Sequence, residues 1–404
     1  MSKILQLFFF LAVFPVCFVN AQSFGLEARW DDGIKFRTKD GATEFSIGGR
    51  VHYDAVFMHQ STSLDSLFDA IPDNVEVRRA RLSFTGTIND AMAYEFEFTF
   101  GEQLEYADMY FAFLKVPLIE KITLGHFREP FGMEEMTSSN SIVFMERSLT
   151  SAFGPSRNTG VMLQKEFLDK KLRAYAGFFR ITNDLGTDLK GNGEHSFSTR
   201  VAYQPISDSS LNRSLHVGAS MRIYRPQERI LEIKTQNESN IAPMYINTGE
   251  ITNVSNVKQV GAEIGYSIKK LCLQSEYIHA FAVEKQVGSD QKQVRDHNSF
   301  YLMASYFLKG GTRTYSNSSN RFSSISVDRM REKGKLGSAW EIAARLSQIN
   351  IAMSEEGIRR MTDVTFGLNW YFNSNSRFMM NYVVASMGDD LRANALQFRM
   401  QVTF

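Results

Sequence analysis

Apolar and polar residues alternate along many short segments of this 404-residue chain. In the closing segment, apolar side chains stand at positions 396, 398, 400, 402 and 404, with polar side chains between them. Successive side chains of a β-strand point to opposite faces, so this segment predicts a strand with one apolar and one polar face that ends at Phe404. Such a strand suits a membrane barrel, apolar toward lipid and polar toward the lumen, and it also suits the edge of a soluble β-sandwich.

The same alternation recurs in about sixteen segments of strand length. Between the second and third, a three-residue turn at Asn89-Asp90-Ala91 is required if their apolar faces are to match. The predicted strands are Phe45–Phe57, Val77–Ile88, Met92–Phe100, Asp108–Val116, Lys121–Phe127, Gly160–Phe167, Leu172–Ile181, Phe197–Tyr203, Leu215–Tyr224, Val260–Ile268, Leu271–Phe281, Phe300–Leu308, Ala339–Ile349, Val364–Phe372, Phe378–Ala385 and Leu396–Phe404.

The connections alternate between tight turns, such as Asp169-Lys170 and Lys269-Lys270, and long polar stretches. Short periplasmic turns and long outer loops are typical of membrane barrels. We therefore predict an all-β fold, a transmembrane antiparallel β-barrel of about sixteen strands, with residues 22–404 as one domain. The stretches expected to be outer surface loops are Pro226–Lys258, Glu284–Asn298 and Gly310–Gly337.

The N-terminus predicts export. Lys3 is followed by an apolar run from Ile4 to Val19 and by Val19-Asn20-Ala21, which fits a signal peptide of residues 1–21 cleaved after Ala21. The run is short for a membrane-spanning helix. Cys17 leaves a lipoprotein signal as an alternative, although Phe14-Pro15-Val16 matches that signal poorly. Cleavage leaves Cys272 as the one cysteine, which excludes an internal disulfide and a cysteine-based zinc site.

Composition adds two constraints. The chain has 33 Phe and 15 Tyr but 8 Pro, and its formal net charge is +1. Apolar residues that occur singly, at every second position, are expected of a barrel whose alternate side chains face lipid. The balanced charge gives no argument for a nucleic-acid partner.

Several segments resemble the phosphate-selective porin O and P family, and the most specific of them lie between Leu124 and Val161. The family implies a sixteen-stranded, usually trimeric outer-membrane channel that passes small solutes, in some members phosphate or polyphosphate. The matching segments are Asp32–Phe36, Leu124–Glu134, Phe144–Leu149, Pro155–Val161, Tyr306–Gly311, Ala339–Arg345 and Gly367–Tyr371.

Inward-facing arginines are the candidate anion contacts. Arg79 and Arg81 share the polar face of the second strand, and the same parity places three more arginines inward. Others bracket or occupy a long segment from Arg128 to Thr159 that interrupts the strand pattern. A guanidinium group stays charged and offers phosphate a planar pair of donors. The pore-lining candidates are Arg50, Arg79, Arg81, Arg128, Arg147, Arg157, Arg345 and Arg399.

Acidic residues on the same faces allow a second interpretation. In the predicted register Glu97 lies opposite Ser83 and diagonal to Arg81, while Glu95 lies opposite Thr85. Glu341 is expected beside Arg345, and the acids at 134, 135 and 146 are expected beside Arg128 and Arg147. A rigid wall of paired charges, an anion-selective ladder and a neutral or cation-leaning pore therefore all remain open. No lysine cluster that would concentrate phosphate is present.

The sequence thus favours a passive outer-membrane porin for small hydrophilic solutes, either general or with a mild preference for phosphate or other anions. A loop around residues 129–158 is expected to fold inward and narrow the channel. Phe404 is expected to act as the assembly signal for the barrel-assembly machinery, and the resemblance implies a homotrimer in outer-membrane lipid.

No cofactor, metal or catalytic residue is expected. The seven histidines are scattered, and none lies in a Gly-x-Ser-x-Gly motif. The alternatives are a barrel that acts as an adhesin or binding protein and a barrel hydrolase.

Overall fold

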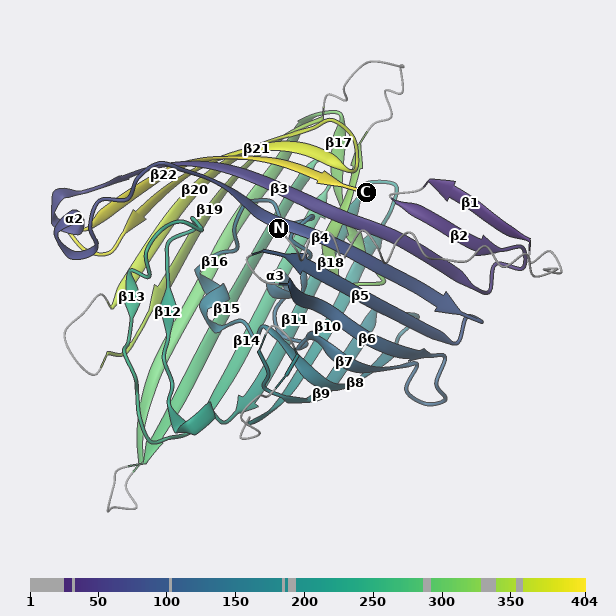
Figure 1. Ribbon diagram of the computed structural model, residues 1–404, viewed down its shortest axis with the longest axis horizontal. Coiled ribbons are helices and arrows are strands. Elements are labelled where there is room, and N and C mark those ends of the chain that lie inside the picture. The colour runs from purple at the N-terminus through teal and green to yellow at the C-terminus, as the bar shows by residue number, and fades with distance from the viewer. Residues whose placement is uncertain are drawn as a thin grey trace, which may run out of the picture.

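The computed structural model describes residues 25–30, 33–101, 104–183, 186–187, 194–285, 292–327, 339–353 and 359–404. Its main sheet has eighteen antiparallel strands, of which two form an N-terminal hairpin and sixteen close into a barrel (Figure 1). The predicted signal peptide, residues 1–21, lies outside the described residues. The barrel strands are β3 (Glu44–Gln60), β4 (Asn74–Ile88), β5 (Met92–Phe100), β6 (Leu104–Leu114), β7 (Lys121–Arg128), β8 (Arg157–Phe167), β9 (Leu172–Arg180), β10 (His195–Asp208), β11 (Arg213–Tyr224), β14 (Val254–Ile268), β15 (Leu271–Lys285), β16 (Lys292–Lys309), β19 (Ala339–Asn350), β20 (Arg360–Tyr371), β21 (Ser376–Ser386) and β22 (Arg392–Thr403).

The predicted all-β antiparallel barrel is confirmed, because each of the sixteen predicted segments overlaps one barrel strand. The barrel closes where β22 pairs with β3, with Arg399 opposite Asp54. The three-residue turn is also confirmed: Ile88 pairs with Met92. Closure leaves no unpaired edge in the barrel wall.

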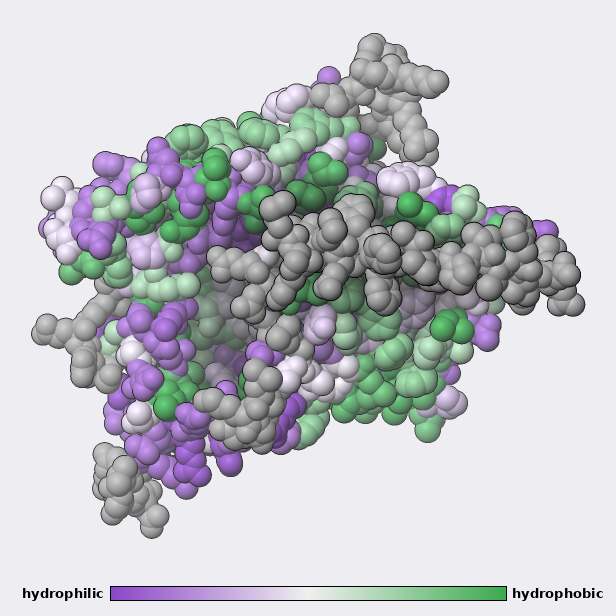
Figure 2. All heavy atoms as spheres, viewed as in Figure 1, coloured by the Kyte–Doolittle hydropathy of each residue, from purple (hydrophilic) through white to green (hydrophobic). Residues whose placement is uncertain are grey.

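Burial follows the alternation of the closing strand. Met400 and Val402 each remain 40% exposed on the outer surface, whereas Arg399 and Gln397 are 0% and 1% exposed. Figure 2 shows hydrophobic side chains gathered on the outer surface over β5–β9, at the lower right of the view. The apolar face therefore points outward and the polar face points into the lumen, as a membrane barrel requires.

An N-terminal hairpin adds two strands to the main sheet, next to the C-terminal end of β22. It consists of β1 (Leu26–Trp30) and β2 (Ile34–Thr38), and it projects beside the chain end in Figure 1. The N–H of Phe404 donates to the carbonyl of Gly49 at 3.0 Å, and β2 then pairs with the preceding part of β3. Beyond the end of β22, strand β2 of the hairpin therefore pairs with the edge of β3 that β22 leaves unpaired.

The connections at the end of the barrel that holds the C-terminus are short, except for one. The turns at residues 89–91, 168–171 and 269–270 lie there, but so does the segment 310–338 between β16 and β19. The expectation that this segment is an outer loop is therefore wrong. Its described part forms a second hairpin, β17 (Gly311–Ser316) and β18 (Arg321–Val327). Polar composition indicates a loop, but it does not indicate on which end of the barrel the loop lies.

The described residues contain few helical turns. The longest helix is α2 (Thr62–Phe68), in the connection between β3 and β4. None of the described helices has the length and apolar character needed to cross a membrane.

Candidate pore lining

The segment between β7 and β8 folds into the lumen, as predicted for residues 129–158. It contains two short helices, α3 (Met133–Met136) and η1 (Leu149–Phe153). Wall side chains bind its backbone: Glu276 accepts the N–H of Met133 at 2.8 Å, and Asn381 accepts the N–H of Met145 at 2.7 Å. These bonds satisfy backbone groups that burial would otherwise leave unpaired. We call residues 129–156 the constriction loop.

A second segment, residues 225–253 between β11 and β14, also enters the lumen, so the expected outer surface loop is wrong here too. The short strands β12 (Lys234–Thr235) and β13 (Ile246–Asn247) pair within it. Glu238 lies 2.5 Å from Arg345 of β19 and accepts the Ser347 hydroxyl at 2.6 Å. The polar residues that suggested a surface loop are instead partners for a polar barrel interior.

The β17–β18 hairpin enters from the opposite end. Arg313 pairs with Glu341 of β19 at 3.0 Å and donates to the carbonyl of Ser141 in the constriction loop at 2.6 Å. Phe322 is 2% exposed. The hairpin is therefore packed against both the barrel wall and the constriction loop.

An apolar core joins the constriction loop and residues 225–253 at the end of the barrel opposite the C-terminus. Because protein interiors are close-packed, we expect this core to hold the constriction loop and residues 225–253 in place. Its members from α2, the constriction loop and residues 225–253 are Leu64, Phe131, Leu149, Phe153, Leu231, Ile233, Ala242, Tyr245, Ile246 and Ile251.

Five partly exposed arginines of the interior form a cluster along β3–β8 and the constriction loop. We call Arg50, Arg81, Arg128, Arg147 and Arg157 the arginine cluster; their side chains are 13–18% exposed. All five are among the eight sequence candidates. The inward position of their side chains follows from the strand parity and from the inward fold of the loop.

Glu97 is the acidic centre of one half of the cluster. It pairs with Arg50, with Arg81 at 2.9 Å and with Arg157 at 3.9 Å. Arg157 also pairs with Asp108 at 2.7 Å. One carboxylate is thus shared by three guanidinium groups, so their positive charge is only partly neutralised.

The other half of the cluster is built on Glu135 of the constriction loop. Glu135 pairs with Arg128 and, at 3.4 Å, with Arg147. Arg321 of the β17–β18 hairpin is close to this half. Burial, followed by the positive charges of Arg200 and Arg147, lowers the pKa of Arg321 to about 10.

Arg321 has no carboxylate partner among the residues that the structure describes, and its Nε atom is buried without a hydrogen bond. With the arginine cluster it makes six positive charges. Four carboxylates lie next to these six arginines: Glu95, Glu97, Asp108 and Glu135. The group therefore has a formal excess of two positive charges.

The remaining three candidate arginines are inside the barrel but bind the loops to the wall. Arg345 pairs with Glu238 at 2.5 Å and with Glu134 at 3.0 Å. Arg399 pairs with Asp54 at 2.6 Å and with Glu146 at 2.8 Å, and Arg79 is 3.7 Å from Glu146. Burial alone would raise the pKa of the Glu146 carboxyl, but Arg78, Arg79 and Arg399 hold it well below its usual value.

The expected counter-charges are also inward, with one difference in pairing. Glu97 pairs with arginine as predicted, whereas Glu95 accepts the Tyr110 hydroxyl at 2.8 Å. Glu341 pairs with Arg313, so its expected pairing with Arg345 is wrong. The sequence pattern could not show this, because Arg313 lies on the hairpin and not on the neighbouring strand.

Several interior arginines were not among the candidates. Arg200 and Arg222 share the inward faces of β10 and β11, so strand parity would have found them; they pair with Glu263 at 2.6 Å and Glu129 at 2.9 Å. Arg78 points inward beside Arg79 because a β-bulge between β3 and β4 interrupts the alternation. No strand parity applies to the hairpin residues Arg313 and Arg321.

The interior offers no evident metal site in the part of the chain that is described, where no group of three or more His, Cys, Asp or Glu side chains could hold an ion. Buried carboxylates pair instead with arginine and histidine side chains of the barrel wall. Glu263, for example, pairs with Arg200 at 2.6 Å and with His216 at 2.9 Å.

Comparison with known proteins places this geometry among channels. The family model of phosphate-selective porin O and P matches residues 45–404. No curated protein matches the sequence.

Solved outer-membrane proteins share the fold. The trimer form of OmpT from Vibrio cholerae has a TM-score of 0.55 and 12% identity, over 90% of this chain and 100% of that one. An anion-selective porin from Comamonas acidovorans has a TM-score of 0.52 and 10% identity, over 90% and 100%. OmpF from Salmonella typhi has a TM-score of 0.52 and 11% identity, over 93% and 100%.

Proposed function

Because the chain belongs to the phosphate-selective porin O and P family and is an outer-membrane channel, we propose that it passes small hydrophilic solutes by diffusion and prefers anions. The observation that carries the preference is the excess of arginine over carboxylate in the arginine cluster and Arg321. No bond is made or broken in this function, and no cofactor takes part.

The preference is expected to be mild. Most interior arginines are paired with carboxylates, and paired charges in a water-filled lumen cancel much of each other's field. The remaining positive charge belongs to the partly neutralised group around Glu97 and to Arg321, which has no carboxylate partner among the described residues. Positively charged side chains along a channel favour anions, and a guanidinium also offers phosphate a planar pair of donors.

Three further features belong to the same proposal. Residues 1–21 direct export and are removed, Phe404 is the signal for the barrel-assembly machinery, and the channel is a homotrimer in the outer membrane. The trimer form of a structural neighbour supports the last of these.

The reversal potential across a planar bilayer under a salt gradient tests the role of Arg321. We expect Arg321→Gln to reduce the anion preference of the channel, because the substitution removes a positive charge that no carboxylate of the described residues neutralises. Arg225→Gln is the matched control, since Arg225 is 53% exposed and distant in sequence from the cluster. An Arg321→Gln channel with the wild-type reversal potential would show that the excess charge does not set selectivity.

A further inference from the structure

Lysines gather at the end of the barrel that holds the C-terminus (Figure 1). They lie near the last residue of β8, in the turn between β8 and β9, in the turn between β14 and β15, and at the last residue of β16. The short turns identify this end as the periplasmic one. We call these lysines the basic rim: Lys165, Lys170, Lys171, Lys269, Lys270 and Lys309.

The lysines of the basic rim have no carboxylate partner in the part of the chain that the structure describes. Lys270 donates to the carbonyl of Leu308 at 3.4 Å, and Lys165 donates to the carbonyl of Leu118. The ammonium group of Lys165 also lies 5.7 Å from the centre of the Phe167 ring. No ion pair with a described residue therefore neutralises these charges.

Positive charge exceeds negative charge on these turns. Arg213, the first residue of β11, adds a seventh positive charge to the six of the basic rim. Three carboxylates lie beside them, those of Glu120, Asp169 and Asp208, so the formal excess is four positive charges. Such an excess on neighbouring turns gives a positive potential that attracts anions.

Aromatic residues of the lipid-facing surface show at what depth the basic rim lies. In three places an outward-facing aromatic residue precedes a rim lysine by three residues, which is at most about 10 Å of chain. Aromatic side chains of membrane barrels lie at the level of the lipid headgroups. The rim lysines therefore lie at this level or just beyond it, toward the periplasm. The three pairs are Phe167 and Lys170, Tyr266 and Lys269, and Tyr306 and Lys309.

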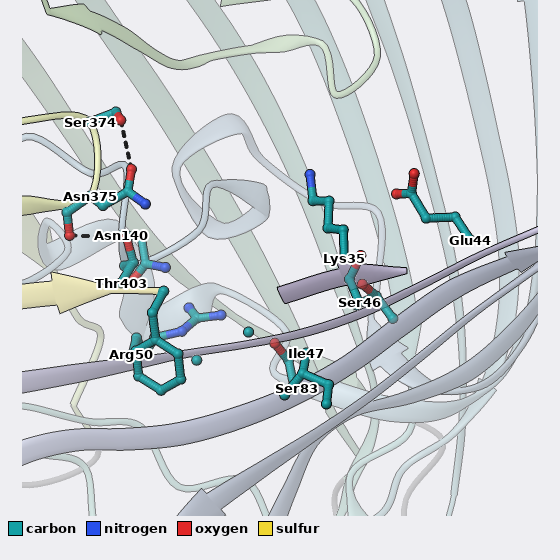
Figure 3. Close-up of a pocket in the computed structure, with 14 residues that line it drawn as sticks. Lys35, Glu44, Ser46, Ile47, Arg50, Ser83, Asn140, Ser374, Asn375 and Thr403 are labelled. Carbon is teal, nitrogen blue, oxygen red and sulfur yellow. Dashed lines mark hydrogen bonds between the residues drawn. The ribbon is translucent and has the colours of Figure 1, made fainter. Parts of the chain in front are cut away.

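The cavity on the lumen side of the same end is different. Its volume is about 370 Å³, and its lining carries charges of both signs. Figure 3 shows Lys35 and Glu44 on one side of the cavity and Arg50 on the other. Charge of one sign therefore gathers on the basic rim at this end, and not in the cavity.

We propose that the basic rim binds the phosphate groups of anionic phospholipids in the periplasmic leaflet of the outer membrane. The rim is positively charged, and its lysines follow lipid-facing aromatic residues at the depth of the headgroups. Clusters of basic residues beside a membrane bind anionic lipids through the same electrostatic attraction. This interaction goes beyond solute diffusion and does not depend on which solutes the channel passes.

A single soluble anion fits the basic rim less well. The β8–β9 and β14–β15 turns are separated by β10 and β11, which is roughly 20 Å at the usual spacing of strands. One small anion cannot contact both turns, whereas separate lipid headgroups can. The flexible stem of lysine also suits phosphates that move with the lipid.

Quenching of tryptophan fluorescence by brominated phospholipids tests the basic rim. Trp340 pairs with Lys309 between β19 and β16, and its ring stacks on Trp370 at 5.1 Å between centroids. Because the chain has three Trp, a Trp30→Phe channel reports from this pair alone. In phosphatidylcholine vesicles we expect brominated phosphatidylglycerol to associate about fivefold more strongly than brominated phosphatidylcholine, equivalent to about 1 kcal/mol.

Two triple variants in the Trp30→Phe channel locate the interaction. The rim variant replaces the three rim lysines nearest Trp340 with glutamine, and the matched control replaces three lysines at the opposite end of β14–β16. Heat-modifiable migration on a gel confirms that each variant is folded. The substitutions are Lys269→Gln, Lys270→Gln and Lys309→Gln in the rim variant and Lys258→Gln, Lys285→Gln and Lys292→Gln in the control.

We expect the rim variant to bind the two lipids equally and the control to keep the fivefold preference. High salt should weaken the preference in the control, because it screens the lysine charges. Equal quenching by the two lipids in the Trp30→Phe channel would show that the lysines are only solvated and would disprove the proposal. Equal loss of preference in the two variants would also disprove it. Both results are separate from the reversal potential, which tests the proposed function.

Discussion

At the scale of single residues, glycines decide how the barrel closes. A Cβ atom at Gly49 would lie 2.6 Å from the tip of the Phe404 ring and 2.6 Å from the Arg81 carbonyl. The N–H of Gly49 donates to the Phe404 carbonyl at 2.7 Å. The last residue of the chain therefore packs on a position of β3 that has no side chain, and both its backbone and its ring depend on that space.

We predict that Gly49→Val reduces the yield of closed barrel, because the added methyl groups collide with the Phe404 ring and with the backbone of β4. The measurement is the fraction of protein that shows heat-modifiable migration on a gel after refolding in detergent. Ala55→Val is the control, since Ala55 is on the outer face of the same strand and valine is favourable in strands. Equal folded fractions for the two variants would contradict this account of closure.

At the scale of elements, Arg345 links two loops to one strand. Its guanidinium pairs with Glu134 of the constriction loop and Glu238 of the second inward segment, and it donates to the Glu146 carbonyl at 2.9 Å. A buried charge that loses its partner is costly, by about 3–5 kcal/mol. Arg345 of β19 therefore anchors both loops at once, in addition to the apolar core that joins them.

We predict that Arg345→Met destabilises the folded channel and increases its mean conductance, because Glu134 and Glu238 lose their buried partner and the loops move from the wall. Conductance steps and the midpoint temperature of heat-modifiable migration measure the two effects. Arg295→Met is the control, since Arg295 pairs with Glu284 of β15 and with neither Glu134 nor Glu238. A lower midpoint with unchanged conductance would show that Arg345 stabilises the barrel without positioning the loops.

The sequence predicted the strands and the constriction loop, but it predicted the other two inward segments as outer loops, for one physical reason. Strand alternation is local, so the sixteen strands and the opposition of Ser83 and Glu97 could be read from neighbouring residues. The position of a loop depends on partners far along the chain, such as Glu238 and Arg345, which are 107 residues apart. The alternation also fails at a β-bulge, which is why Arg78 was not expected inside.

At the scale of the whole molecule, three inward segments convert a wide barrel into a narrow channel with uneven charge. The constriction loop, residues 225–253 and the β17–β18 hairpin bury their contacts against β15 and β19–β22. The partly exposed charges lie mainly along β3–β8, where arginine exceeds carboxylate. Selectivity is therefore expected to arise from one side of the lumen.

The most direct test of this account is the reversal potential of the wild-type channel under a potassium chloride gradient across a planar bilayer. We predict conductance steps and a reversal potential displaced toward the equilibrium potential of chloride, with a smaller displacement at high salt because screening weakens the arginine field. A displacement toward the equilibrium potential of potassium would contradict it.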